Sequence, residues 1–248
     1  MSGHSKWSTI KRKKGALDAK RAKIFTKIIK EITVATKEGG GSDPDTNPRL
    51  RLAIQNAKGA NMPKDTIARA VKKGSGADAA NYVEVTYEGY APHGVAVFVE
   101  CMTDNLNRTV ANVRAVFSKY GGDLGKNGSL EFIFARKGMF VIPITEGMDE
   151  DDLTMEFIDG GAEEVEFDEG FITISCAMED FGNMQKKLEE LKLETETAEL
   201  QRIPNNLKAL DDEGLLSAMK LIDMLEDDDD VQNVYHNLDI QDSQVELV

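Results

Sequence analysis

Positive and negative charges are segregated along this sequence, and that asymmetry is the strongest constraint on how the chain is organised. Residues 1–75 contain 18 Lys and Arg against 6 Asp and Glu, a net charge of +12. Residues 76–248 contain 12 Lys and Arg against 38 Asp and Glu, a net charge of −26, so the whole chain carries −14. A basic head on an acidic body is typical of a nucleic-acid-binding protein whose body avoids non-specific contacts with polyanions.

The composition predicts a soluble globular protein with two or three domains. The chain has 248 residues, of which 41% are hydrophobic and 30% charged. No apolar run is long enough to span a membrane, and the Lys-rich start lacks the apolar core of a signal peptide. The two cysteines, Cys101 and Cys176, lie far apart and outside any CxxC motif. This usage fits a reducing, cytoplasmic location, with both thiols expected to be buried as small apolar groups.

Three helices are predicted in the basic head, at residues 16–37, 49–58 and 64–73. Gly39–Gly41 ends the first helix, and Asn47 is the expected N-cap of the second, with Pro48 at its first position. Residues 1–14 show no apolar periodicity and are expected to order only on a partner. Trp7, the one Trp of the sequence, either packs back on the helices or stacks on a base or sugar.

The first predicted helix carries a stripe of lysines beside its apolar side. Lys20, Lys23, Lys27 and Lys30 fall within a sector of about 80° when the helix is projected at 100° per residue. Such a stripe is usually a solvated face. Here it continues the basic run at residues 11–14, which favours a surface that follows a phosphate backbone.

The remainder of the chain predicts an α+β fold in which one α/β domain is inserted in another. Strands at 82–87, 95–99 and 130–134 surround a helix at 108–120, and a helix at 211–226 with a strand at 234–240 completes this middle domain. Between them lie a strand at 139–144, a helix from 149, a hairpin at 163–167 and 171–176, a helix at 180–191 and a strand at 195–200. This β-α-β-β-α-β order is ferredoxin-like. Residues 146–199 hold 19 acidic and 3 basic side chains, a net charge of −16. The predicted domains are 1–76, 77–137 with 204–248, and 138–203.

The sequence shows no pattern of catalytic or metal-ligating residues. His4, His93 and His236 lie outside ligand spacing, and no cofactor or metal is predicted. The run from Gly121 to Lys126 resembles a phosphate loop, but Tyr120 stands where a Gly is needed and Asn127 where Ser or Thr is needed. An enzyme is therefore the least favoured class. No helix-turn-helix signature, zinc finger or aromatic RNA-binding pattern is recognisable either.

Four stretches of this sequence resemble the YebC family, which includes the mitochondrial translational activators of the cytochrome oxidase type. They are GHSKWSTIKRKKGALDAKRAKIF, DPDTNPRLRLAIQNAKGANMPKDTIARAVKKGSG, YEGYAPHGVAVFVECMTDNLNRT and GGDLGKNGSL. The resemblance implies a helical head and two ferredoxin-like domains, the third inserted in the second. It also implies a cytoplasmic transcriptional regulator, while other members look like ribosome-associated factors that relieve stalls at proline runs.

By position, the family's basic-head motif falls on Lys6, Trp7, Lys11, Lys14, Arg21, Asn47, Arg49, Arg51, Asn61 and Lys64. Charge pattern and resemblance together predict that nucleic acid is bound by Lys6, Trp7, Lys11, Arg12, Lys13, Lys14, Lys20, Arg21, Lys23, Lys27, Lys30, Arg49, Arg51, Lys58, Lys64 and Arg69. The TDNLNRT stretch places Asp104, Asn105, Asn107 and Arg108 at a strand-to-helix junction, where they cap the helix or line an inter-domain groove.

Two functions remain open from the sequence. In the first, a monomeric transcriptional regulator binds DNA phosphates through its basic head. In the second, a ribosome-bound translation factor reaches ribosomal or transfer RNA with its head and basic proteins with its acidic domain. A domain of −16 would be repelled by long duplex DNA, which favours the second function.

Overall fold

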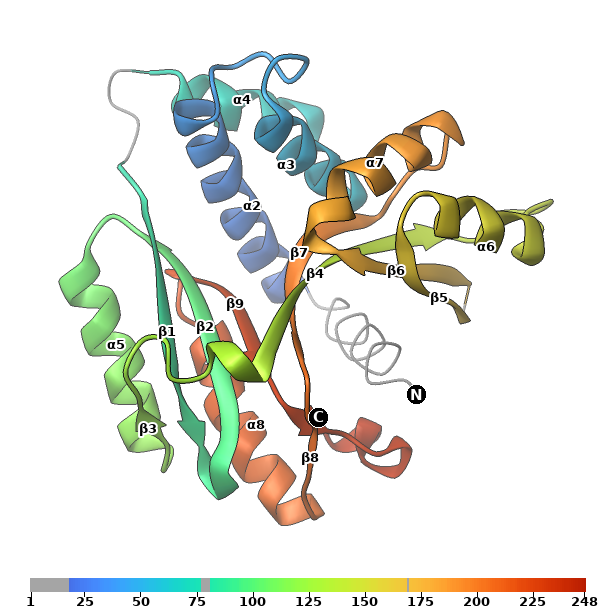
Figure 1. Ribbon diagram of the computed structural model, residues 1–248. Coiled ribbons are helices and arrows are strands. Elements are labelled where there is room, and N and C mark those ends of the chain that lie inside the picture. The colour runs from blue at the N-terminus through green and yellow to red at the C-terminus, as the bar shows by residue number, and fades with distance from the viewer. Residues whose placement is uncertain (1–17, 77–80, 169) are drawn as a thin grey trace. The chain divides into compact units, whose positions relative to one another are not determined.

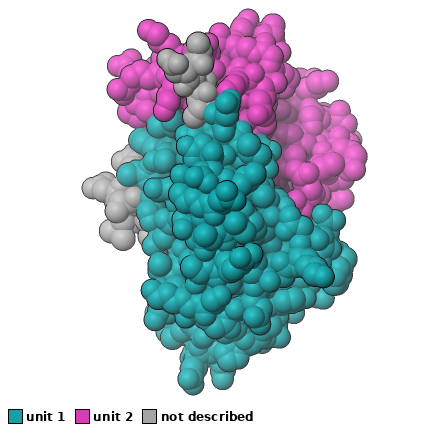
Figure 2. Space-filling model, turned by 90° about the vertical axis from the view of Figure 1, so that its left-hand side faces the viewer, with its two compact units in different colours: residues 1–30, 80–135, 203–248 teal, residues 31–79, 136–202 magenta. Residues whose placement is uncertain are grey.

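The computed structural model describes residues 18–76, 81–168 and 170–248, and the side chains of residues 18–21 and 242 lie outside the described set. The chain divides into two compact units (Figure 2). Residues 1–30, 80–135 and 203–248 belong to unit 1, and residues 31–79 and 136–202 belong to unit 2. Helix α2 (Asp18–Glu38) contributes to both units. The three predicted domain ranges stay a prediction.

The three helices predicted for the basic head are confirmed. After α2 come α3 (Pro48–Gly59) and α4 (Lys64–Gly74), which lie beside the C-terminal half of α2 (Figure 1). The buried Asn47 side chain accepts a hydrogen bond from the Leu50 N–H at 3.0 Å, as an N-cap does. Its amide donates to the carbonyls of Ala35 and Gly41, at 2.7 and 2.8 Å. One side chain therefore joins the end of α2, the glycine turn and the start of α3.

Unit 2 contains the predicted ferredoxin-like domain. Its elements are β4 (Phe134–Pro143, which begins in unit 1), α6 (Glu150–Asp159), β5 (Ala162–Asp168), β6 (Phe171–Ala177), α7 (Phe181–Glu190) and β7 (Thr197–Pro204). The sheet order is β5-β6-β4-β7, which places the first strand between the third and the fourth. Phe140 faces Ile174 across the antiparallel β4–β6 pair, and both side chains lie in a core with Phe157 and Met184 of the two helices.

Helix α3 covers the edge of this sheet that β7 forms. The Asn56 amide donates to the Ala198 carbonyl at 2.8 Å and accepts from the Ala198 N–H at 2.9 Å, so it pairs with β7 as a neighbouring strand would. Gln55 donates to Thr195 Oγ1 at 2.6 Å. At Gly59 the Glu196 carbonyl occupies the position that a Cβ atom would take. A sheet edge left open invites pairing with other chains, and α3 prevents this along β7.

Unit 1 is built on a second four-stranded sheet with the order β3-β1-β2-β9. Its elements are β1 (Val83–Ala91), β2 (Val95–Thr103), α5 (Leu106–Lys119), β3 (Asp123–Leu124), α8 (Asp212–Glu226) and β9 (Val231–His236). Short strands β8 (Lys208–Ala209) and β10 (Leu238–Asp239) pair in parallel, and a 3₁₀ turn, η5 (Asp242–Leu247), follows. The chain is therefore α+β, as predicted. In this sheet the first two strands, β1 and β2, form an antiparallel hairpin with no helix between them, unlike the first two strands of unit 2.

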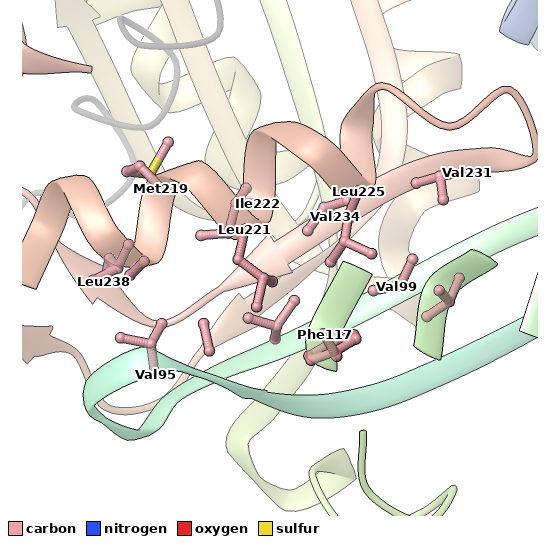
Figure 3. Packing of buried hydrophobic residues seen from close by; sticks show 14 of the residues in the cluster. Val95, Val99, Phe117, Met219, Leu221, Ile222, Leu225, Val231, Val234 and Leu238 are labelled. Carbon is pink, nitrogen blue, oxygen red and sulfur yellow. The ribbon is translucent and has the colours of Figure 1, made fainter. Parts of the chain in front are cut away.

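Strand β2 is buried on both faces of the sheet. Val95, Val97 and Val99 lie in the main core with α5 and α8, as Figure 3 shows for Val95 and Val99. The intervening Ala96 and Phe98 pack on the opposite face. This alternation follows the two-residue period of a strand.

The predicted strand at 130–134 is wrong. Residues Glu131–Ile133 form a 3₁₀ turn, β4 begins at Phe134, and the third strand of this sheet is instead β3. Leu130, Ile133 and Phe134 are spaced as on a helix, and all three cover the outer face of the sheet beside Phe98. The buried Glu88 carboxylate holds this segment, because it accepts the N–H groups of Gly128 and Leu130 at 2.6 Å each.

Among the residues described here, no helix has the length and apolar character that crossing a membrane requires. Both cysteines are buried, as predicted. Desolvation raises the pKa of Cys101 to about 12 and that of Cys176 to about 11, so both thiols stay protonated at neutral pH.

Gly59→Ala is expected to lower the free energy of unfolding by about 1–3 kcal/mol, because the added methyl group forces α3 away from the Glu196 carbonyl. Gly182→Ala is the matched control. Gly182 lies in α7 with no atom near its Cβ position, so the change is expected to be neutral or stabilising by up to about 1 kcal/mol. Calorimetric melting of both variants measures the difference, and equal melting temperatures would contradict the close packing of α3 on β7.

Candidate nucleic-acid interface

The predicted nucleic-acid-binding residues fall into three groups in the structure. Lys6, Trp7, Lys11, Arg12, Lys13 and Lys14 lie outside the described residues, as do the side chains of Lys20 and Arg21. Lys23, Lys27, Lys30 and Arg49 make bonds within their own units. Arg51, Lys58, Lys64 and Arg69 are exposed on α3 and α4. Whether any of these groups binds nucleic acid stays a prediction.

Three lysines of α2 contact the acidic turn at residues 227–230 or the adjoining start of β9, within unit 1. Lys23 Nζ lies 2.6 Å from Asp227 Oδ1, and Lys27 Nζ donates to the Gln232 carbonyl at 3.1 Å. The buried Lys30 ammonium donates to the Asp229 carbonyl at 2.6 Å and lies 3.2 Å from Asp230 Oδ1. Three lysines of the predicted phosphate-following stripe therefore also hold this turn.

Asp230 is the centre of a buried polar network. Besides Lys30, its carboxylate accepts from Arg108 Nε at 3.1 Å and Nη2 at 2.7 Å, from Thr109 Oγ1 at 2.9 Å and from Thr103 Oγ1 at 3.1 Å. Burial raises the pKa of Asp230, but the hydrogen bonds from Arg108, Thr109 and Lys30 outweigh it and hold that pKa below its ordinary value. The carboxylate is thus ionised and joins α2, β2, α5 and the turn before β9.

The residues of the TDNLNRT stretch belong to this network or to the start of α5. Asn105 is the N-cap of α5 and accepts from the Arg108 N–H at 3.1 Å. Arg108 pairs with Asp104 at 2.9 Å and with Asp230. Asn107 is exposed in the first turn of α5. The capping alternative is confirmed for Asn105, whereas the groove stays a prediction.

Sequence reasoning missed Asp230, Thr103 and Thr109. Asp230 closes a run of five acidic residues, 226–230, and nothing local distinguishes its buried carboxylate from the four before it. Asp230 lies 121 and 127 positions from the two threonines, so only the fold brings them together.

Basic side chains gather on the exposed surfaces of α3 and α4 in unit 2. Arg51 and Lys58 project from α3, and Lys64 and Arg69 from α4; the exposed Lys72 and Lys73 of α4 add to them. Arg49 is only half-exposed and pairs with Glu31 at 2.8 Å and with Glu38 at 3.8 Å, which fixes α3 to α2. In the same unit, α6 begins with Asp149 as its N-cap and three acidic residues in its first turn. Unit 2 therefore combines a basic helix pair with an acidic domain.

The described residues contain no group of three or more His, Cys, Asp or Glu side chains placed to hold a metal ion. What the described residues do show on α3 and α4 is a set of exposed basic side chains.

Asp230→Ala is expected to lower the free energy of unfolding by about 3–5 kcal/mol, because it leaves the buried Lys30 ammonium without its carboxylate. Asp229→Ala is the control, since Asp229 is exposed and its carbonyl, which accepts from Lys30, remains. That variant is expected within about 0.5 kcal/mol of the parent. Denaturant midpoints measure both, and comparable losses would contradict the role of the Asp230 carboxylate.

The stabilisation from Asp230 is expected to depend on pH. Because its folded-state pKa is lowered, the contribution is full above the ordinary Asp pKa of about 4 and is lost as pH falls through the folded-state value. The difference in unfolding free energy between the parent and Asp230→Asn should therefore shrink from about pH 5 to about pH 2. Equilibrium unfolding at stepped pH measures it, and a constant difference would exclude an ionised Asp230.

Comparisons with known proteins agree with this architecture. Two protein-family models match the chain. The model described as "TACO1/YebC protein N-terminal domain" matches residues 5–77, and the one described as "TACO1/YebC second and third domain" matches residues 82–238. A relative from Amoebophilus asiaticus is 60% identical over 96% of this chain and 98% of its own, and one from Idiomarina loihiensis is 52% identical over 98% and 97%. Each carries the name "Probable transcriptional regulatory protein".

A solved structure shares the fold. The crystal structure of a conserved hypothetical protein from Aquifex aeolicus matches with a TM-score of 0.80 and 43% identity, covering 91% of this chain and 93% of the other. The resemblance seen in the sequence is thereby confirmed, since both domain descriptions and full-length relatives match. The chain belongs to the TACO1/YebC family.

Proposed function

We propose that this protein is a nucleic-acid-binding regulator of gene expression, in the first place a DNA-binding transcriptional regulator of the cytoplasm that acts as a monomer. The observation that carries the proposal is the exposed set of Arg51, Lys58, Lys64 and Arg69 on two adjoining helices. These four residues are part of the basic segment 1–75, whose net charge is +12. The names of the relatives support regulation of transcription, and they describe regulators rather than enzymes.

Lys and Arg bind nucleic acid by displacing condensed counterions from phosphates, so affinity falls as salt rises. Each neutralised phosphate of duplex DNA adds about −0.9 to the slope of log affinity against log salt. If about six side chains engage, the slope is about −5. This term supplies affinity and position without reading sequence.

A second function is favoured by the charge of the acidic domain. Residues 146–199 carry −16, and α3 is bonded to this domain through Asn56 and Gln55. A phosphate backbone near α3 would meet that repulsion. A ribosome presents RNA together with basic proteins, so a translation factor could place the helices on ribosomal or transfer RNA and the acidic domain on protein. Relief of stalls at proline runs is the corresponding activity that the family resemblance implies.

A direct competition distinguishes the two functions. Full-length protein is offered purified ribosomes and an excess of promoter-length duplex DNA at about 150 mM salt, where charges more than about 8 Å apart are largely screened. Retention on particular DNA fragments supports transcriptional regulation. Co-sedimentation with ribosomes that DNA does not displace supports the translational function and makes the DNA binding non-specific.

Arg51→Ala with Lys58→Ala is expected to weaken binding to any duplex and to reduce the magnitude of the salt slope by about 2, because two phosphate contacts are lost. Lys186→Ala with Lys192→Ala removes the same charge from exposed positions of the acidic domain and is the matched control. Affinity measured by fluorescence anisotropy at several salt concentrations gives both slopes. If the two pairs weaken binding equally, total charge and not the α3–α4 surface governs affinity.

A further inference from the structure

The connection between α3 and α4 has a geometry that the sequence pattern did not reveal. Four residues, 60–63, join the helices, and Asn61 adopts the left-handed conformation with φ 57°. The Met62 N–H donates to the Ala57 carbonyl at 2.9 Å, and the Asn61 N–H donates to the Lys58 carbonyl at 2.8 Å. These two bonds form the Schellman motif, which closes α3 and turns the chain sharply into α4. Gly usually occupies the left-handed position, and here Asn, which also tolerates it, takes its place.

Each of the two helices, and the connection between them, has a buried side. Ala57, Met62, Ile67 and Ala70 are all buried. At the end of α4, a Cβ on Gly74 would lie 2.8 Å from Thr36 Cβ of α2. The inner side of α4 is therefore buried along its length, at Ile67, Ala70 and Gly74.

The outer surface of α4 is open from its first residue. Two neighbouring rows of side chains face solvent there, Lys64, Ala68 and Lys72 in one row and Asp65 and Arg69 in the other. Arg69 is partly oriented by its own helix, because Nε donates to the Asp65 carbonyl at 3.2 Å and Nη2 to Thr66 Oγ1 at 3.1 Å. The small Ala68 is exposed between Lys64 and Lys72, so in the described part of the chain the helix backbone is accessible there to a flat or grooved ligand.

We propose that α3 and α4 form a helix-turn-helix whose second helix, α4, enters the major groove of duplex DNA and reads base edges. This assignment deepens the proposed function and rests on it. In such motifs two helices joined by a turn of three or four residues place the N-terminal residues of the second helix against bases, while the first crosses the phosphate backbone. The four-residue turn, the buried inner side and the exposed outer side of α4 agree with this arrangement.

Duplex DNA is the ligand that this shape fits. The major groove of B-form DNA is about 12 Å wide and admits an α-helix, whereas the major groove of A-form RNA is too narrow to be read this way. Arg69 offers guanidinium donors to guanine O6 and N7, and Asp65 is an acceptor for cytosine N4. In this arrangement Arg51 and Lys58 of α3 contact phosphates. Helix α3 thereby positions the protein on the duplex, while α4 reads the bases.

The test selects binding sites from a pool of short duplexes with a randomised centre, using the full-length protein. The assignment predicts that the parent enriches one motif, and that Arg69→Ala loses about tenfold to a hundredfold of the preference for it over random duplex. Arg51→Ala is the matched control, since this Arg is also exposed but lies on α3. It is expected to weaken binding to all sequences equally and to keep the motif. Circular dichroism checks that each variant keeps its helix content.

Three other results of this selection experiment would contradict the assignment of α4 or the proposed function. Salt-dependent binding without an enriched motif, or a motif that survives Arg69→Ala unchanged, overturns α4 as a reading helix and leaves the proposed nucleic-acid binding intact. Binding of folded RNA in preference to every duplex also overturns the assignment to the major groove. If the parent binds no nucleic acid at about 150 mM salt, the proposed function itself fails.

Discussion

The buried carboxylate of Asp230 is the interaction on which unit 1 depends. It faces the ammonium of Lys30 and the guanidinium of Arg108, and two threonine hydroxyls complete its hydrogen bonds. A buried charge is costly unless it is paired and fully hydrogen-bonded, and this one is both. Because its donors come from α2, β2 and α5, removing the carboxylate affects three elements at once.

In unit 2, side-chain amides perform a comparable function with neutral groups. Asn47 links the end of α2 to the start of α3, and Asn56 pairs with the backbone of β7. A side-chain amide can donate and accept at the same time, so each of these two residues bonds to both backbone N–H and backbone C=O groups. Asn47 and Asn61, which the family motif places among the residues of the basic head, have structural roles at a helix start and a helix end.

These constraints leave a basic surface of unit 2 exposed. Helix α3 is held by its buried apolar residues and by the amides of Gln55 and Asn56, and α4 by its buried apolar side. Arg51, Lys58, Lys64 and Arg69 remain exposed to solvent. The acidic domain on the other side of Asn56 limits where a polyanion can approach, since like charges repel most strongly where few counterions intervene.

The sequence by itself determined the elements whose signals are local. The N-cap and Pro at the start of α3, the ferredoxin-like order of unit 2 and the charge segregation follow from neighbouring residues, and so does the family, through its motifs. The tertiary structure decided where the third strand of unit 1 lies, because the spacing of Leu130, Ile133 and Phe134 acquires meaning only against Phe98. It also decided which basic residues are exposed. Lys30 and Lys58 look alike in sequence, but a partner 200 positions away buries the first, and no local pattern encodes such a contact.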